Sequence, residues 1–169
     1  MSEFTLPEQL NVFDFAKQNM QLAGEFPLGA CSRLAAQTGN NQKVTASINL
    51  KFSYEGELPV LRGEVRAPLT LQCQRCLSPF VCEIISNFAL GVVRAEQEAE
   101  NSPGAVETIV VPDGLLLSSE LIEDELLLNL PIVPKHEIDQ CQVKLPVVEL
   151  GGHQTRKNPF AVLASLKED

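Results

Sequence analysis

Tryptophan is absent from this 169-residue chain and tyrosine occurs once, so few rings are available to stack on nucleic acid bases. No apolar run approaches the length of a membrane span, and the opening stretch MSEFTLPEQL has neither the basic start nor the apolar core of a signal peptide. The chain also lacks a glycine-rich nucleotide-binding pattern and the G-x-S-x-G and H-E-x-x-H motifs. We therefore expect a cytoplasmic protein that has no membrane partner and is not an enzyme.

Basic residues are few, since 13 Lys and Arg stand against 22 Asp and Glu, a formal net charge of −9. This charge excludes an unspecific attraction of the whole molecule to nucleic acid or to an anionic membrane. The acids are concentrated in residues 95–140, which hold eleven of them and a single base, Lys135, whereas residues 61–94 hold four arginines and two glutamates. We expect two electrostatic faces, one suited to phosphate and one suited to a basic protein.

Alternation of apolar and polar residues predicts three successive strands, at 43–54, 61–73 and 80–93. The first two have one wet face, and the third is apolar enough to be buried on both faces. Short connections favour an antiparallel meander, and Pro68 predicts a sheet edge or a bulge because it has no N–H to donate. The predicted fold class is therefore α+β, an antiparallel β-meander with peripheral short helices, with closure into a barrel left as an alternative.

The remaining elements are weaker in the sequence, and the chain as a whole, 1–169, is long enough for one domain. Glu-rich residues 95–105 are typical of a mobile acidic loop, and prolines and glycines make 131–157 irregular. Helical spacing and capping residues predict helices at 7–20, from Ser118/Ser119 to 130, and after Asn158-Pro159, with a further strand at 106–111.

Cys73-Gln74-Arg75-Cys76 lies at the turn between the second and third predicted strands, where two thiolates could hold one Zn²⁺. A closed site needs two more ligands, for which Cys82, Cys141, His136 and His153 are available. Cys82 and Cys31 fit better as small core residues. The candidate metal set is therefore Cys73, Cys76, Cys141 and His136, and the alternative is that these thiols are reduced and partly buried at a sheet corner. Zinc is the one cofactor that the sequence suggests.

A basic stripe follows the wet face of the first two strands, beside neutral side chains that can form hydrogen bonds. Such a face could contact a phosphodiester backbone, although it could equally be an ordinary solvated sheet face. The candidate RNA-binding residues are Lys43, Lys51, Arg62, Arg66 and Arg75.

Three acids, Glu120, Glu123 and Asp124, are spaced to share one face of the helix predicted near 118–130. Their position near the helix N-terminus is explained by the helix dipole alone, and no His, Ser or Lys motif accompanies them. They are kept as candidate residues for binding a basic protein.

Three ordered blocks give the sequence a resemblance to a known family. They are Leu71-Gln72-Cys73-Gln74-Arg75-Cys76 with Pro79-Phe80, then Glu123-Asp124-Glu125-Leu126-Leu127-Leu128 running into Leu130-Pro131-Ile132-Val133-Pro134 with His136 and Cys141, and finally Asn158-Pro159-Phe160-Ala161-Val162-Leu163-Ala164-Ser165-Leu166-Lys167. With these blocks the chain resembles the bacterial YceD family, the large ribosomal RNA subunit accumulation proteins. Some relatives carry a second paired-cysteine motif near the C-terminus, where this chain has only Cys141.

The resemblance implies a non-enzymatic role in ribosome biogenesis, in the synthesis, processing or stability of 23S rRNA, with 23S rRNA or its precursor as a direct or indirect partner. Two alternatives stay open. The first is an acidic adaptor that binds a basic large-subunit ribosomal protein, and the second is a structural zinc-binding module.

Overall fold

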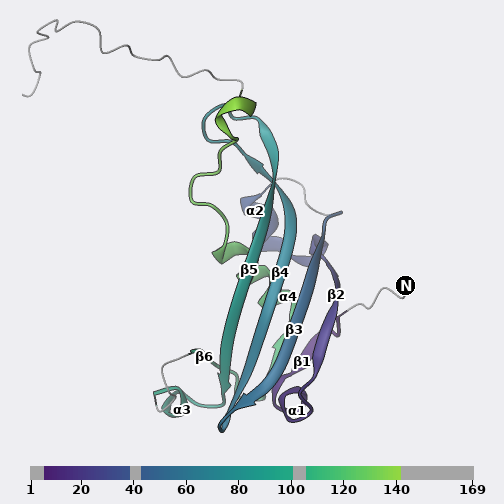
Figure 1. Cartoon of the computed structure of the whole chain (residues 1–169), viewed down its shortest axis with the longest axis vertical. Coiled ribbons are helices and arrows are strands. Elements are labelled where there is room, and N and C mark those ends of the chain that lie inside the picture. The colour runs from purple at the N-terminus through teal and green to yellow at the C-terminus, as the bar shows by residue number, and fades with distance from the viewer. Residues whose placement is uncertain (1–5, 39–42, 101–105, 142–169) are drawn as a thin grey trace, which may run out of the picture.

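Long antiparallel strands dominate the computed structural model, which describes residues 6–38, 43–100 and 106–141 (Figure 1). The elements, in chain order, are β1 (Gln9–Asn11), α1 (Val12–Lys17), β2 (Gln21–Pro27), a 3-10 turn η1 (Leu28–Ala30), α2 (Ser32–Gln37), β3 (Thr45–Glu55), β4 (Leu58–Gln72), β5 (Pro79–Val93), α3 (Glu96–Glu100), β6 (Glu107–Val110), β7 (Leu115–Leu117), α4 (Ser118–Leu128) and η2 (Ile138–Gln140). In the described part of the chain, no helix is long and apolar enough to cross a membrane.

The main sheet has the order β2-β3-β4-β5-β6, in which all neighbours are antiparallel except β5 and β6. The predicted α+β class and the predicted meander are confirmed, because the three expected strands are β3, β4 and β5 joined by short turns. The sheet is open within the described residues and forms no closed barrel there. A small second sheet pairs β1 with β7.

Pro68 occupies a place in β4 where a missing N–H costs little. The pairing of β3 with β4 ends at Ser47 and Arg66, whereas the pairing of β4 with β5 continues to Gln72 and Pro79. Pro68 therefore lies beyond the end of the β3 ladder, where β4 is locally an edge strand. The edge expected at this proline is confirmed.

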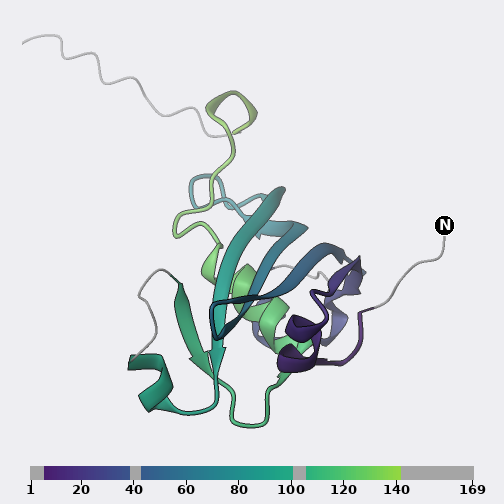
Figure 2. The same ribbon diagram turned by 60° about the horizontal axis from the view of Figure 1, so that its bottom comes forward.

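One face of the sheet is buried, and the other is open except near the β3–β4 turn, where Leu58, Val60 and Val93 pack against Val106. Along β3, the inward residues from Ala46 to Phe52 are at most 4% exposed, while the alternate residues contact solvent. Helix α4 lies against the buried face, and the two views agree that the strands run across it (Figures 1 and 2). The core contains side chains from the strands, α1, α2 and α4. Away from that turn, the alternate residues of β3 leave the opposite face exposed to solvent in the described part of the chain.

Several details differ from expectation. The first helix begins at Val12 and not at Pro7, because Asn11 caps it through a bond from the backbone N–H of Asp14 and the preceding residues are extended in β1. Strand β2 was not predicted. The third strand is not buried on both faces along its length, since Val81 is 68% exposed. The hydroxyl of Ser118 donates to the carbonyl of Pro7 and does not cap α4.

Two other expectations fall wholly or partly outside the described residues. The acidic stretch 95–105 includes the short helix α3, and its last five residues are not described. The terminal helix expected after Asn158 lies beyond residue 141, as does most of the irregular segment 131–157.

Burial of Glu125 in the interface between α4 and β5 predicts a measurable pH effect. Ser86 donates to its carboxylate at 2.6 Å, but burial outweighs this bond and raises the pKa of Glu125 above its ordinary value. The folded protein thus favours protonated Glu125, and this contribution to stability is lost as the pH rises through the raised pKa. We expect Glu125→Gln to raise the melting temperature at pH 7 but not at pH 4. Glu120→Gln, on the exposed side of the same helix, is the control, and a lower melting temperature for Glu125→Gln at pH 7 would contradict the argument.

Candidate metal centre

The hairpin between β4 and β5 positions the two cysteines of the C-x-x-C motif. Cys73 N–H donates to the carbonyl of Ser78 at 3.0 Å, and Leu77 N–H donates to the carbonyl of Cys73 at 2.8 Å, which closes a tight turn. Leu77 has a φ of 61°, a left-handed conformation that is costly for a leucine by roughly 1 kcal/mol. Such backbone strain is kept where the surroundings fix a functional geometry.

A second segment, which follows α4, crosses the hairpin and brings two more ligands to it. The backbone N–H of Gln74 donates to the carbonyl of Pro134 at 2.9 Å, and its side chain reaches the carbonyl of Ile132 at 3.4 Å. The ring of His136 lies 4.8 Å from the ring of Phe80, measured between centroids. Contacts from β5 and from the hairpin therefore orient the histidine toward the cysteines.

Cys73, Cys76, His136 and Cys141 come together at this end of the sheet. Each offers one ligand atom, and these four atoms all lie within 4.8 Å of one another. Cys76 Sγ and His136 Nδ1 are 3.4 Å apart. In a tetrahedral zinc site, bonds of about 2.0 to 2.3 Å separate the ligand atoms by roughly 3.3 to 3.8 Å. The donor set and its spacing therefore fit a metal ion such as Zn²⁺ after small movements, and all four residues are the ones the sequence suggested.

The surroundings of Cys73 favour its thiolate form. Its side chain is fully buried, and burial alone would raise its pKa. Hydrogen bonds to its sulfur from the backbone of Cys76, His136 and Arg75, and from the side chain of His136, reverse this effect and lower the pKa to about 5. Because metal binding requires deprotonated thiols, this environment favours coordination at neutral pH.

The other two cysteines lie outside the cluster. Cys31 is 1% exposed, and burial together with the charge of Glu123 raises its pKa to about 11, so it remains a thiol. Cys82 is partly buried against the core. Both positions agree with their interpretation as small core residues.

Four of the five candidate RNA-binding residues lie near the open face of the sheet, and the fifth does not. Lys51 lies directly across from Arg62, and Arg66 lies across from Ser47. Lys43 is exposed just before β3. Arg75, in contrast, lies in the metal-binding hairpin and directs its guanidinium at the segment 136–141. The sequence placed Arg75 in the right turn but gave no signal for its contacts, because its partners are more than sixty residues away.

The open face carries acids as well as bases. Arg66 forms a two-bond pair with Glu64, at 2.8 and 3.0 Å, and Arg62 forms one with Glu55 at the end of β3. Glu25 and Glu83 also lie on this face, by the register of β2 and β5. The sequence did not show this balance because β2 was not foreseen and the third strand was expected to be buried on both faces.

The three candidate acids of α4 have different surroundings in the fold. Glu120 is exposed, whereas Glu123 is only 7% exposed and accepts hydrogen bonds from Arg33 at 2.9 Å and from Leu34 N–H at 3.0 Å. Asp124 pairs with the same arginine at 2.7 Å. Glu123 therefore joins α2 to α4, and its side chain is already occupied within the molecule.

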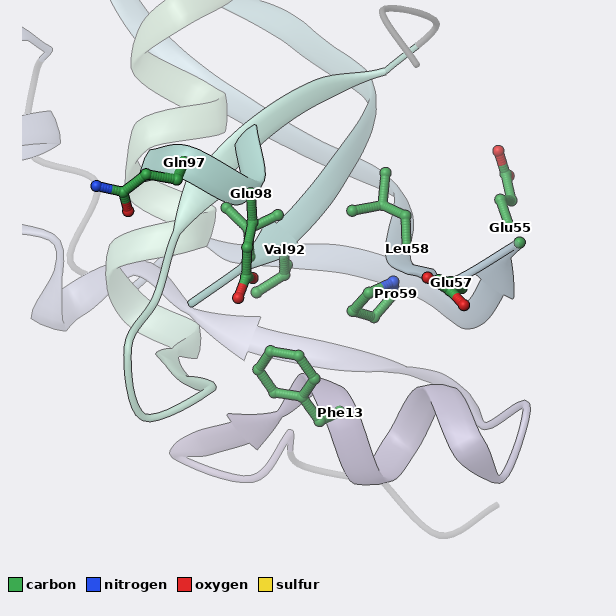
Figure 3. A pocket seen from close by; sticks show the side chains of 10 residues that line it. Phe13, Glu55, Glu57, Leu58, Pro59, Val92, Gln97 and Glu98 are labelled. Atoms are coloured by element: carbon green, nitrogen blue, oxygen red, sulfur yellow. The ribbon is translucent and has the colours of Figure 1, made fainter. Parts of the chain in front are cut away.

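A cavity of about 700 Å³ lies at the other end of the sheet (Figure 3). Its floor is apolar, and the carboxylates of Glu55, Glu57 and Glu98 lie around it. None of its lining residues is a cysteine, serine or histidine. The cavity therefore offers carboxylates but no thiol, hydroxyl or imidazole among its lining residues, and the cysteine and histidine cluster lies at the hairpin end.

These features define an α+β protein whose open, mostly antiparallel sheet carries at one end a cysteine and histidine cluster that could bind a metal. The family model described as Large ribosomal RNA subunit accumulation protein YceD matches residues 61–167, which include the whole cluster, and the chain belongs to this family. It is 29% identical over 174 residues to the Large ribosomal RNA subunit accumulation protein YceD of Haemophilus influenzae, with 99% of each chain covered. No solved structure matches the chain.

Proposed function

We propose that this protein is a non-enzymatic ribosome biogenesis factor that supports the accumulation of 23S rRNA. The observation that carries the proposal is the match over nearly the full chain to a relative named for large ribosomal RNA subunit accumulation. The candidate site is consistent with such a role, because its ligand set is typical of structural metal centres.

The open sheet face is the surface through which we infer contact with RNA. Lys51 and Arg62 are directly opposite each other on neighbouring strands, a like-charge arrangement that destabilises a sheet by several tenths of a kcal/mol. Within the described residues, Lys43 and Lys51 take part in no ion pair. Glu55 already pairs with Arg62, so a phosphate bound here would chiefly balance the charge of Lys51. The neighbouring neutral side chains offer hydrogen bonds to sugar and phosphate. Those neutral neighbours, by the strand register, are Gln21, Asn49, Ser47 and Asn87.

The test is the salt dependence of binding to transcribed fragments of 23S rRNA. We expect Lys51→Gln with Arg62→Gln to weaken binding and to lower the slope of log K against log salt by about 1.4 to 1.8, since each lost phosphate contact removes roughly 0.7 to 0.9. Lys17→Gln, in the last turn of α1, removes one positive charge away from this face and is the control for Lys51→Gln and Arg62→Gln taken singly. An unchanged slope in the double variant would show that this face is not the RNA contact.

A broader experiment distinguishes an RNA partner from a protein partner. Tagged protein is recovered from lysate at low salt, with and without ribonuclease, and both RNA and proteins are identified. Precursor of 23S rRNA crosslinked to residues 43–72 would support the proposal. A basic large-subunit ribosomal protein that stays bound after ribonuclease, and is released by Glu120→Lys, would replace it with the acidic adaptor.

We also propose that Cys73, Cys76, His136 and Cys141 bind one Zn²⁺ as a structural ion. The support is the donor set, three thiolates and one imidazole, together with the spacing of the four atoms. Bound zinc would fasten the segment after α4 to the β4–β5 hairpin. It would thus hold one end of the proposed RNA-binding sheet in place.

A further inference from the structure

Arg75 lies between the two hairpin cysteines and contacts the opposite half of the cluster. Its Nε donates to Cys141 Sγ at 3.0 Å, and its Nη2 donates to the carbonyls of His136 at 2.9 Å and Glu137 at 3.4 Å. The side chain is partly buried. One guanidinium therefore touches a thiol ligand and the backbone of a second ligand, and it joins the hairpin to the segment that crosses it.

The charge of the cluster explains why a cation is placed there. Three thiolates and a neutral imidazole around a divalent ion leave a net charge of about −1 in a partly buried site. Arg75 forms no ion pair with a carboxylate among the described residues, so its positive charge is directed at the sulfur of Cys141. A charge-assisted N–H to sulfur bond stabilises the thiolate form, and the planar fork of arginine fixes its direction.

We propose that Arg75 is a positioning residue of the metal centre, which balances the charge of the three thiolates and holds Cys141 and His136 in place for coordination. The inference rests on the proposed zinc binding. It also gives Arg75 a different role from the other four candidate RNA-binding residues, because its donors contact the proposed ligand Cys141 and the backbone of His136.

The experiment measures zinc affinity by competition with a chromophoric chelator, on the full chain purified without oxygen. Outer residues that orient metal ligands contribute about 10- to 100-fold to affinity, so we expect Arg75→Gln to weaken zinc binding by that factor. Arg75→Lys keeps the charge but loses the fork, and we expect an intermediate loss. Lys17→Gln removes a positive charge on α1, away from the hairpin, and should leave the affinity unchanged.

The absorption spectrum of the Co²⁺-loaded protein would not change if Arg75 only stabilised the fold. In Co²⁺-loaded protein, the near-ultraviolet band reports charge transfer from sulfur to metal. A hydrogen bond lowers the energy of the sulfur lone pairs, so its loss in Arg75→Gln should shift this band to longer wavelength at an unchanged tetrahedral visible spectrum. The Arg75→Lys protein serves the same purpose if the glutamine variant does not fold.

The possible results distinguish the role of Arg75 from the zinc binding on which it rests. If the wild-type protein binds neither zinc nor cobalt, zinc binding itself fails. If wild-type protein binds zinc but Arg75→Gln and Arg75→Lys bind it equally tightly and show the same cobalt band, the metal centre stands and the role of Arg75 is overturned. A weakened affinity with a shifted band, and an unchanged salt slope for RNA, supports the role proposed here.

Discussion

Replacement of Cys76 by serine is expected to abolish the binding of one zinc ion per chain and to lower the melting temperature by about 10 °C. An ion that binds only the folded protein stabilises it by about 4 kcal/mol when its free concentration is a thousand times its dissociation constant. For a chain of this size, 1 kcal/mol corresponds to roughly 2 to 4 °C. The effect is large because Cys76 and His136 join segments 60 residues apart, at 3.4 Å.

The matched control is Cys82→Ser, which removes a partly buried cysteine of β5 that is not part of the cluster. We expect this variant to retain one equivalent of zinc in elemental analysis. A chelator should lower the melting temperature of wild-type and Cys82→Ser protein, but not that of Cys76→Ser. If wild-type protein contains no zinc, and if its melting temperature responds to neither the metal nor the chelator, the proposed metal centre is wrong.

The four proposed metal ligands could be named from the sequence, but the two pairs of ligands differ in how strongly the sequence indicates them. The spacing of Cys73 and Cys76 is a local motif, and a turn between two alternating strands is where such a motif can hold a metal. Cys141 and His136 could be named as candidates beside Cys82 and His153. Their approach to the hairpin depends on the path of the chain after α4, which the backbone bonds of Gln74 fix and no local pattern encodes.

Strand β2 shows why the sheet was predicted only in part. Its outward positions include Ala23 and its inward positions include Gly24, so the alternation that identified β3 and β4 is blurred in β2. The parallel pairing of β6 with β5 is likewise a tertiary feature. This affects the charge of the proposed RNA-binding face, because Glu25 on β2 and Glu83 on β5 reduce the positive charge that the first two predicted strands suggested.

Glu123 illustrates a residue whose role depends wholly on tertiary contacts. In the sequence it belongs to an acidic stripe with Glu120 and Asp124, which favoured a binding surface. In the fold its carboxylate satisfies the backbone N–H of Leu34, a residue that is 1% exposed, and pairs with Arg33. Burial opposes ionisation, but these two hydrogen bonds dominate and hold the pKa of Glu123 below its ordinary value.

We therefore expect Glu123→Ala to lower the free energy of unfolding at pH 7 by about 3 kcal/mol, since it removes two hydrogen bonds to a charged group and leaves a buried N–H unpaired. Because the folded pKa of Glu123 is lowered, its stabilising contribution is present above the ordinary pKa of a glutamate and is lost as the pH falls through the lowered value. The difference between wild type and variant should thus be full at pH 7 and shrink in acid, as measured by urea unfolding across this range.

The control for Glu123 is Asp124→Asn, which removes the other carboxylate that pairs with Arg33. The Asp124 side chain is 54% exposed, and a surface ion pair of this kind contributes at most about 1 kcal/mol. Equal and small losses in the two variants would mean that the contact between α2 and α4 does not depend on Glu123. A large loss confined to Glu123→Ala would assign this acid to the interior of the protein, and would leave Glu120 as the acid of the predicted stripe that remains available to a basic partner.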